Sequence, residues 1–136
     1  MNRPILFVYQ LLTGISDTST GSLLQIAPGL TLRLMGLHAP SDALAYLSFI
    51  GAFVFSVGLS CLYGAYLAYQ GRHKPQLEII WLLTAFARAS VAIFVIGQVL
   101  VGRLEAGWLT VTVVDSAFVL VQAIGLRKGW LAHATN

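Results

Sequence analysis

Four stretches of the chain are apolar and long enough to form transmembrane helices. They cover residues 5–26, 43–69, 77–101 and 108–126. A helix needs about 20 mostly apolar residues to cross the hydrocarbon core of a bilayer. The second stretch has no charged residue, whereas the first has a polar run from Thr13 to Ser22. We interpret the first stretch as an uncleaved helix with a polar inner face, and we expect four spans in one domain covering residues 1–136.

The composition supports a membrane protein. Hydrophobic residues make up 57% of the chain and charged residues 10%, and the mean hydropathy is +0.81. Soluble domains have roughly 45–50% apolar and about 25% charged residues. The single cysteine excludes a disulfide-based scaffold. The sequence therefore predicts an all-α fold, an integral membrane four-helix bundle, with the lipid bilayer as its first partner.

The basic residues predict the orientation of the chain. With four spans, the termini and the connection at 70–76 share one side of the membrane, which carries Arg3, Arg72, Lys74, Arg127 and Lys128. The positive-inside rule places that side in the cytoplasm. The segment 27–42 is too short and broken to span, and we expect it to lie on the membrane surface. The net charge of +3 is then a topology signal, and we expect no nucleic-acid partner.

Three predicted spans each place one ionisable residue at a similar depth. Asp17, Arg88 and Asp115 lie about 11–12 residues from the cytoplasmic ends of their helices, which corresponds to roughly 16–18 Å at 1.5 Å per residue. Because charged groups at this depth are costly unless they are paired, buried or hydrated, we expect Arg88 to be shared by the two carboxylates. Thr84 and Gln122 fall on the same helical faces and complete the predicted polar cluster.

This cluster has two interpretations. An arginine between two acids can simply hold helices in one arrangement. Alternatively, two carboxylates and one guanidinium leave a formal charge of −1, so that one aspartate could be protonated, bind a cation or face an amine-containing ligand. The sequence leaves both open.

Small residues recur at every fourth position of the second stretch. The stripe consists of Ala52, Ser56, Ser60, Gly64 and Ala68. Such stripes let helix backbones approach closely. We expect packing inside the bundle, with contact to another subunit as the alternative. Cys61, in the same stretch, is interpreted as a small buried residue.

The residues of known catalytic and cofactor-binding motifs are missing from the predicted spans. All three histidines, His38, His73 and His133, lie outside them, so none is placed to bind a haem within the membrane. There is no Cys-x-x-Cys pair and no phosphate-binding glycine loop. We therefore expect no metal, no cofactor and no self-contained catalytic site in this chain.

The layout resembles the small DoxX-like four-helix membrane proteins of bacteria. The resemblance rests on Ala27-Pro28 followed by residues 32–37, on Gly51 and Gly58, on Arg88, and on a Gly102-Arg103-Leu104 turn before Trp108 and Asp115. It covers nearly the whole chain and implies a bacterial inner-membrane protein. Some DoxX-like proteins are accessory subunits or are associated with quinone-linked sulfur oxidation.

Together, these features predict an accessory or scaffold subunit that packs against itself or against a larger membrane complex. The alternative is a proton- or cation-coupled carrier, or a small-ligand binder, that uses the Asp17–Arg88–Asp115 cluster. Small multidrug exporters, which also have four helices and an acid in the first, provide an analogy for the alternative.

Overall fold

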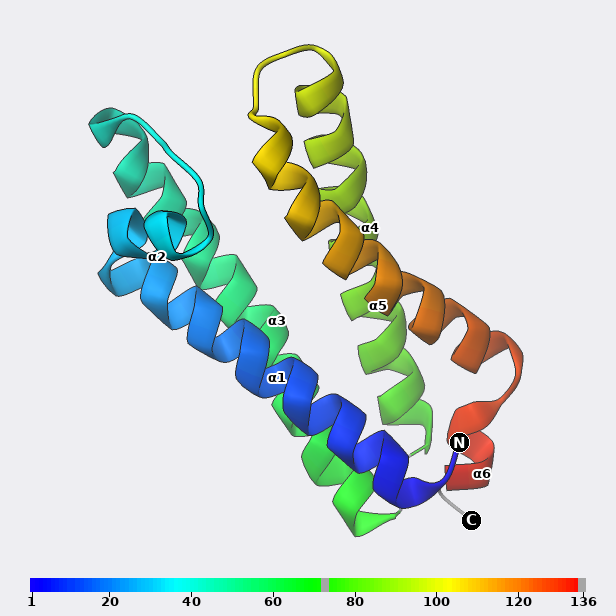
Figure 1. Ribbon diagram of the computed structural model, residues 1–136. Coiled ribbons are helices and arrows are strands. Elements are labelled where there is room, and N and C mark those ends of the chain that lie inside the picture. Colours follow the sequence, from blue (N-terminus) through cyan, green and yellow to red (C-terminus); the bar gives the residue numbers. More distant parts are fainter. Residues whose placement is uncertain (72–73, 135–136) are drawn as a thin grey trace.

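The computed structural model describes residues 1–71 and 74–134, and these residues are almost entirely helical, with no strand among them (Figure 1). Arg72 and His73, in one predicted connection, lie outside the described residues. The four long helices follow the predicted stretches closely; they are α1 (Arg3–Ile26), α3 (Leu44–Gln70), α4 (Lys74–Leu100) and α5 (Leu109–Arg127). The short elements are α2 (Pro28–Leu34), η1 (Ser41–Ala43), η2 (Ala106–Trp108) and α6 (Trp130–Ala134).

Three helical segments are long and apolar enough to cross a membrane. Among the described residues these segments are Ser41–Gln70, Lys74–Leu100 and Ala106–Arg127, with mean hydropathies of 1.9, 2.2 and 1.9. They mark the chain as an integral membrane protein. Helix α1 is of similar length but has the polar run at its centre, and it does not belong to this group. The fourth span therefore stays a prediction.

The long helices form two pairs. Helix α1 packs along α3, and α4 packs along α5, with fewer contacts between α3 and α4 (Figure 1). The pairs meet at the end that carries the N-terminus and α6, and they spread apart toward the opposite end (Figure 1). We call these the closed end and the spread end. The arrangement places the interior residues of α1, α4 and α5 on facing surfaces near the middle of the molecule.

Glycines allow α1 and α3 to approach closely. A Cβ atom added to Gly51 of α3 would lie 2.7 Å from Cβ of Leu24 and 2.9 Å from the carbonyl oxygen of Gly21. One added to Gly58 would overlap the backbone of Thr18. Real Cβ atoms do not come this close, so the seam requires glycine at these positions.

An apolar core closes the end near the N-terminus. Its buried members are Leu6, Leu67, Ala68, Leu77, Trp81 and Leu131. Arg3 ties α1 to α3 beside this core, because its Nε donates to the carbonyl oxygen of Ala68 over 3.0 Å. Helix α3 ends at Gln70, and the φ of 69° at the following Gly71 is the left-handed conformation that glycine adopts without strain. A basic residue at this helix C-terminus is also favourable for the helix dipole.

A second, smaller core lies at the spread end. Leu32, Leu37 and Leu47 are buried there, and Trp108 packs against them. Leu37 also packs closely against Gly107. A Cβ atom added to Gly107 would lie only 2.7 Å from a terminal methyl of Leu37. The segment after α2 therefore joins the two helix pairs at this end.

Candidate functional site

Arg88 joins three helices near the middle of the molecule. Its Nη1 donates to Oδ1 of Asp115 over 2.6 Å, and its Nη2 donates to Oδ2 of Asp17. The Arg88 side chain is 6% exposed, and those of Asp17 and Asp115 are 14% and 13% exposed. The structure thus brings together the three charges that the sequence places at one depth. One guanidinium serves two carboxylates, as its five N–H donors permit.

An aromatic ring packs against the arginine. The guanidinium carbon of Arg88 lies 4.6 Å from the centre of the Phe118 ring, a cation–π geometry. Tyr9 packs against the same region, with its ring centre 6.0 Å from that of Phe118 and 5.5 Å from that of Trp81. The Phe118 ring therefore covers one face of the guanidinium and excludes water from that face.

Thr84 and Gln122 also come together, as part of the predicted cluster. Nε2 of Gln122 donates to Oγ1 of Thr84 over 2.8 Å, and this hydroxyl donates to the carbonyl oxygen of Ile80 over 2.7 Å. Gln122 is fully buried and Thr84 is 3% exposed. The contact is a polar link between α4 and α5, one turn from Arg88 along α4.

Several buried polar atoms around these residues have no hydrogen-bond partner within the described part of the chain. They are the Tyr9 hydroxyl, both amide atoms of Gln10, the Thr18 hydroxyl, Nε1 of Trp81, Nε of Arg88, the Thr112 hydroxyl and Oε1 of Gln122. Buried polar groups are normally hydrogen-bonded, because leaving one unsatisfied costs about 1–3 kcal/mol. These atoms lie on α1, α4 and α5, the three helices that Arg88 joins.

The small-residue stripe of α3 does not lie on one face, and the expectation of internal packing is wrong for three of its five residues. Ala52, Ser56 and Ser60 are exposed, whereas Gly64 and Ala68 are buried. Because a helix turns about 100° per residue, each step of four residues rotates by about 40°, so the stripe winds around α3. The hydroxyls of Ser56 and Ser60 donate back to carbonyl oxygens of their own helix, both over 2.9 Å.

Sequence reasoning missed Tyr9 and Phe118 as neighbours of Arg88. Phe118 follows Asp115 by three residues, and Tyr9 precedes Thr13 by four, so both lie near the predicted polar faces. Helical spacing could have placed them near the cluster. It could not distinguish them from the other aromatic residues, most of which face outward. Cys61 is buried, as expected, on the inner side of α3.

Among the described residues, no group of three or more His, Cys, Asp and Glu side chains could hold a metal ion. Comparisons with protein families, with curated proteins and with solved structures find no match to this chain. The function must therefore be argued from the chain's own residues, and the DoxX-like resemblance stays an expectation.

Proposed function

We propose that this protein is an accessory or scaffold subunit of a larger membrane assembly, and that α3 is the helix that docks on its neighbour. The observation that carries the proposal is the exposed part of the small-residue stripe, Ala52, Ser56 and Ser60. The three residues occupy successive turns of α3, in the apolar stretch that has no charged residue.

Small residues favour helix association in a membrane because they let two backbones approach and increase van der Waals contact. The serine hydroxyls are already satisfied within α3, so docking would leave no polar group unpaired. Large residues flank this strip, including Phe49 and Phe53, whose rings meet edge to face at 5.0 Å. A partner helix would therefore meet small residues next to exposed aromatic rings on one face of α3.

We also propose how the protein lies in its membrane. Helix α1 is the fourth span, both termini lie in the cytoplasm, and the membrane is the bacterial inner membrane. The polar face of α1 supports its membrane insertion, because Gln10 and Thr13 are buried and Asp17 is paired with Arg88. Its apolar residues, such as Val8 and Leu12, face outward, where lipid would contact them.

The docking role is tested by enlarging the exposed strip. Ser60→Leu adds bulk at a surface position, so we expect the protein to fold normally but to leave its complex. The measurement is extraction of the native membrane in a gentle detergent, followed by size separation and mass spectrometry. We expect the unmodified chain to migrate in a stoichiometric complex and the variant to migrate as a smaller particle.

Ser90→Leu is the matched control. Ser90 is exposed on α4, and its hydroxyl also donates to a carbonyl oxygen of its own helix, that of Phe86, over 2.9 Å. This substitution should leave the complex intact. If the unmodified chain migrates alone, or if both variants behave alike, the docking proposal is wrong.

A second candidate function is a proton- or cation-coupled carrier, and the pairing of two carboxylates with one guanidinium favours it specifically. The cluster has a formal charge of −1 when both aspartates are ionised. A proton or a small cation would neutralise this charge.

The carrier is tested by proton uptake in proteoliposomes with a pH-sensitive dye inside and a potassium diffusion potential as the driving force. For a carrier, Asp17→Asn should abolish uptake while the protein still inserts and elutes normally. Asp42→Asn, at an exposed acid in η1, is the control and should retain uptake. Uptake that is absent from the unmodified protein, or equal in both variants, would exclude this function.

A further inference from the structure

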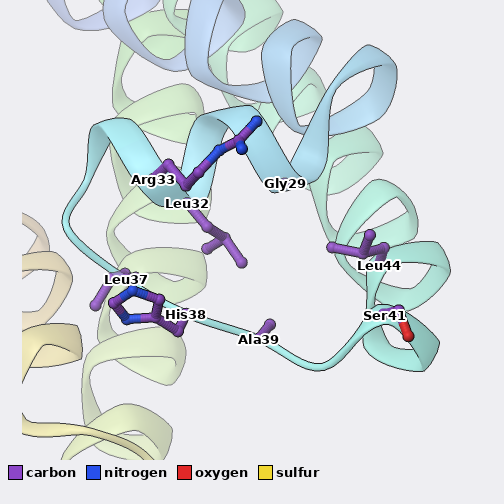
Figure 2. A pocket seen from close by; sticks show the side chains of 8 residues that line it. All are labelled: Gly29, Leu32, Arg33, Leu37, His38, Ala39, Ser41 and Leu44. Carbon is purple, nitrogen blue, oxygen red and sulfur yellow. The ribbon is translucent and has the colours of Figure 1, made fainter.

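We propose that a pocket at the spread end binds one anionic phospholipid from the surrounding leaflet. Figure 2 shows the pocket between α2, the segment that follows it and the start of α3. Its volume is about 410 Å³, and it is lined by Gly29, Leu32, Arg33, Leu37, His38, Ala39, Ser41 and Leu44. This site is separate from the Arg88 cluster and from the exposed strip of α3.

The pocket has an apolar wall that is fixed by the fold. Leu32 and Leu37 are each only 1% exposed and belong to the second core. Leu44, at the first turn of α3, forms the facing wall (Figure 2). An apolar surface of this kind, open on one side, fits the upper part of an acyl chain better than it fits a polar solute.

Polar groups lie along the same pocket. Arg33 and His38 are exposed, and Ser41 provides a hydroxyl. Glu105 lies 3.9 Å from Nδ1 of His38, so an acidic side chain already accompanies the imidazole. The permanent positive charge of the pocket is therefore that of Arg33, whose planar guanidinium matches a phosphate.

The position of the pocket in the membrane selects the ligand. Two of the apolar segments begin beside it, at Ser41 and Ala106, so it lies where the spans meet the headgroup region. Trp108, which packs against the same core, is a residue type typical of that interface. A phospholipid presents both chemistries there, an acyl chain for the leucines and a phosphate for Arg33, and an anionic headgroup adds attraction to the basic side chain.

The test measures lipid binding to the purified full chain in detergent by native mass spectrometry. The probes are dioleoyl phosphatidylglycerol and dioleoyl phosphatidylcholine, which have the same acyl chains. We expect tighter binding of phosphatidylglycerol, and we expect Arg33→Gln to weaken it by about fivefold, the effect of one basic contact at a lipid surface. Arg103→Gln removes an exposed basic residue that does not line the pocket, and it should change nothing.

A second variant tests the apolar wall without removing charge. A Cβ atom added to Gly29 would lie 3.9 Å from both terminal methyls of Leu44 and would meet nothing closer, so Gly29→Leu should fill the pocket without disturbing the fold. We expect it to abolish the preferential binding of phosphatidylglycerol. Gly97→Leu adds the same side chain on α4, where a Cβ atom meets nothing within 4 Å, and it should bind lipid normally.

Three results would overturn the proposal. The first is equal binding of the two lipids. The second is an equal response of each variant and its control. The third is displacement of phosphatidylglycerol by millimolar inorganic phosphate, which would make the pocket a site for a free anion instead of a lipid.

Discussion

Arg88 balances two carboxylates, so the consequences of removing charges at this site are unequal. Removing Asp17 or Asp115 leaves the guanidinium with one counter-ion. Removing Arg88 leaves two acids in a low-dielectric interior, and within the described part of the chain no other basic side chain forms an ion pair with either of them. The desolvation cost of such groups is several kcal/mol each, which only the missing arginine offsets.

We therefore predict that Arg88→Leu is more destabilising than Asp115→Asn. The first substitution should lower the free energy of unfolding by about 3–5 kcal/mol, the cost of breaking a buried ion pair. The second should cost about 1.5–3 kcal/mol, the value of a hydrogen bond to a charged group. The order of stability of the two variants is measured by heating each detergent-solubilised protein and recording the fraction that still elutes as a folded particle.

A triple variant separates charge from packing. Adding Asp17→Asn and Asp115→Asn to Arg88→Leu removes all three charges and should restore part of the stability that Arg88→Leu loses. If the triple variant is the least stable of the set, the loss arises from the packing of Arg88 against Phe118 and not from uncompensated carboxylates.

The charges of this site were predictable because they are rare. Only a few ionisable residues lie within the apolar stretches, and counting depth at 1.5 Å per residue was enough to bring Asp17, Arg88 and Asp115 together. The aromatic neighbours were not predictable in the same way. An aromatic residue is stable either against lipid or inside a bundle, so neither hydropathy nor spacing decides that Phe118 faces Arg88 while Phe86 faces outward.

At the scale of the helices, the seam between α1 and α3 repeats every seven residues. Gly14 and Gly21 line it on α1, and Gly51 and Gly58 line it on α3. A seven-residue repeat keeps one face toward a partner that crosses at a small angle, because two turns of helix span about seven residues. The four-residue stripe read from the sequence selects a face that rotates away from this seam, which is why Ala52 proved to be exposed.

This seam predicts opposite effects for two glycine substitutions. Gly58→Ala should destabilise the protein by about 1–3 kcal/mol, because the added methyl group would overlap the backbone of Thr18 and force the helices apart. Gly97→Ala should be neutral or stabilise by up to about 1 kcal/mol, since its Cβ meets nothing and alanine favours helix. Parallel thermal melts of the two variants measure the difference. Equal melting temperatures would show that the α1–α3 seam can relax, contrary to the packing described here.

At the scale of the whole molecule, the described residues join the two helix pairs at three levels. The apolar core around Trp81 joins the pairs at the closed end, and Leu37 joins them to Gly107 at the spread end. Between these, the ion pair of Arg88 with Asp17 connects α4 to α1. Helix α1 contributes Asp17 to the contact at the middle of the molecule. It is therefore an integral part of the fold.

This position of α1 is the physical argument for proposing α1 as a fourth span although its hydropathy is low. Gln10, Thr13 and Asp17 face the protein, while Ile5 and Leu12 are among the apolar residues that face outward. The mean hydropathy of a helix counts all its residues equally. It is therefore low even for a helix whose polar side chains face the protein and never contact lipid. The depth of the partner also matters, because Arg88 is near the middle of an apolar helix and its carboxylate partners must reach that depth.

We therefore predict that the two ends of α1 are accessible from opposite sides of the membrane. In a Cys61→Ala background, single cysteines at Asn2, Pro40, Arg103 and Lys128 are labelled with a membrane-impermeant maleimide, in right-side-out and in inverted vesicles. Pro40 and Arg103 should share one side, and Lys128 should lie on the other, because α3, α4 and α5 each cross once. Asn2 should be labelled together with Lys128 if α1 spans the bilayer.

Labelling of Asn2 together with Pro40 would instead place α1 at the membrane surface, and the pairing of Asp17 with Arg88 at mid-membrane depth would then be wrong.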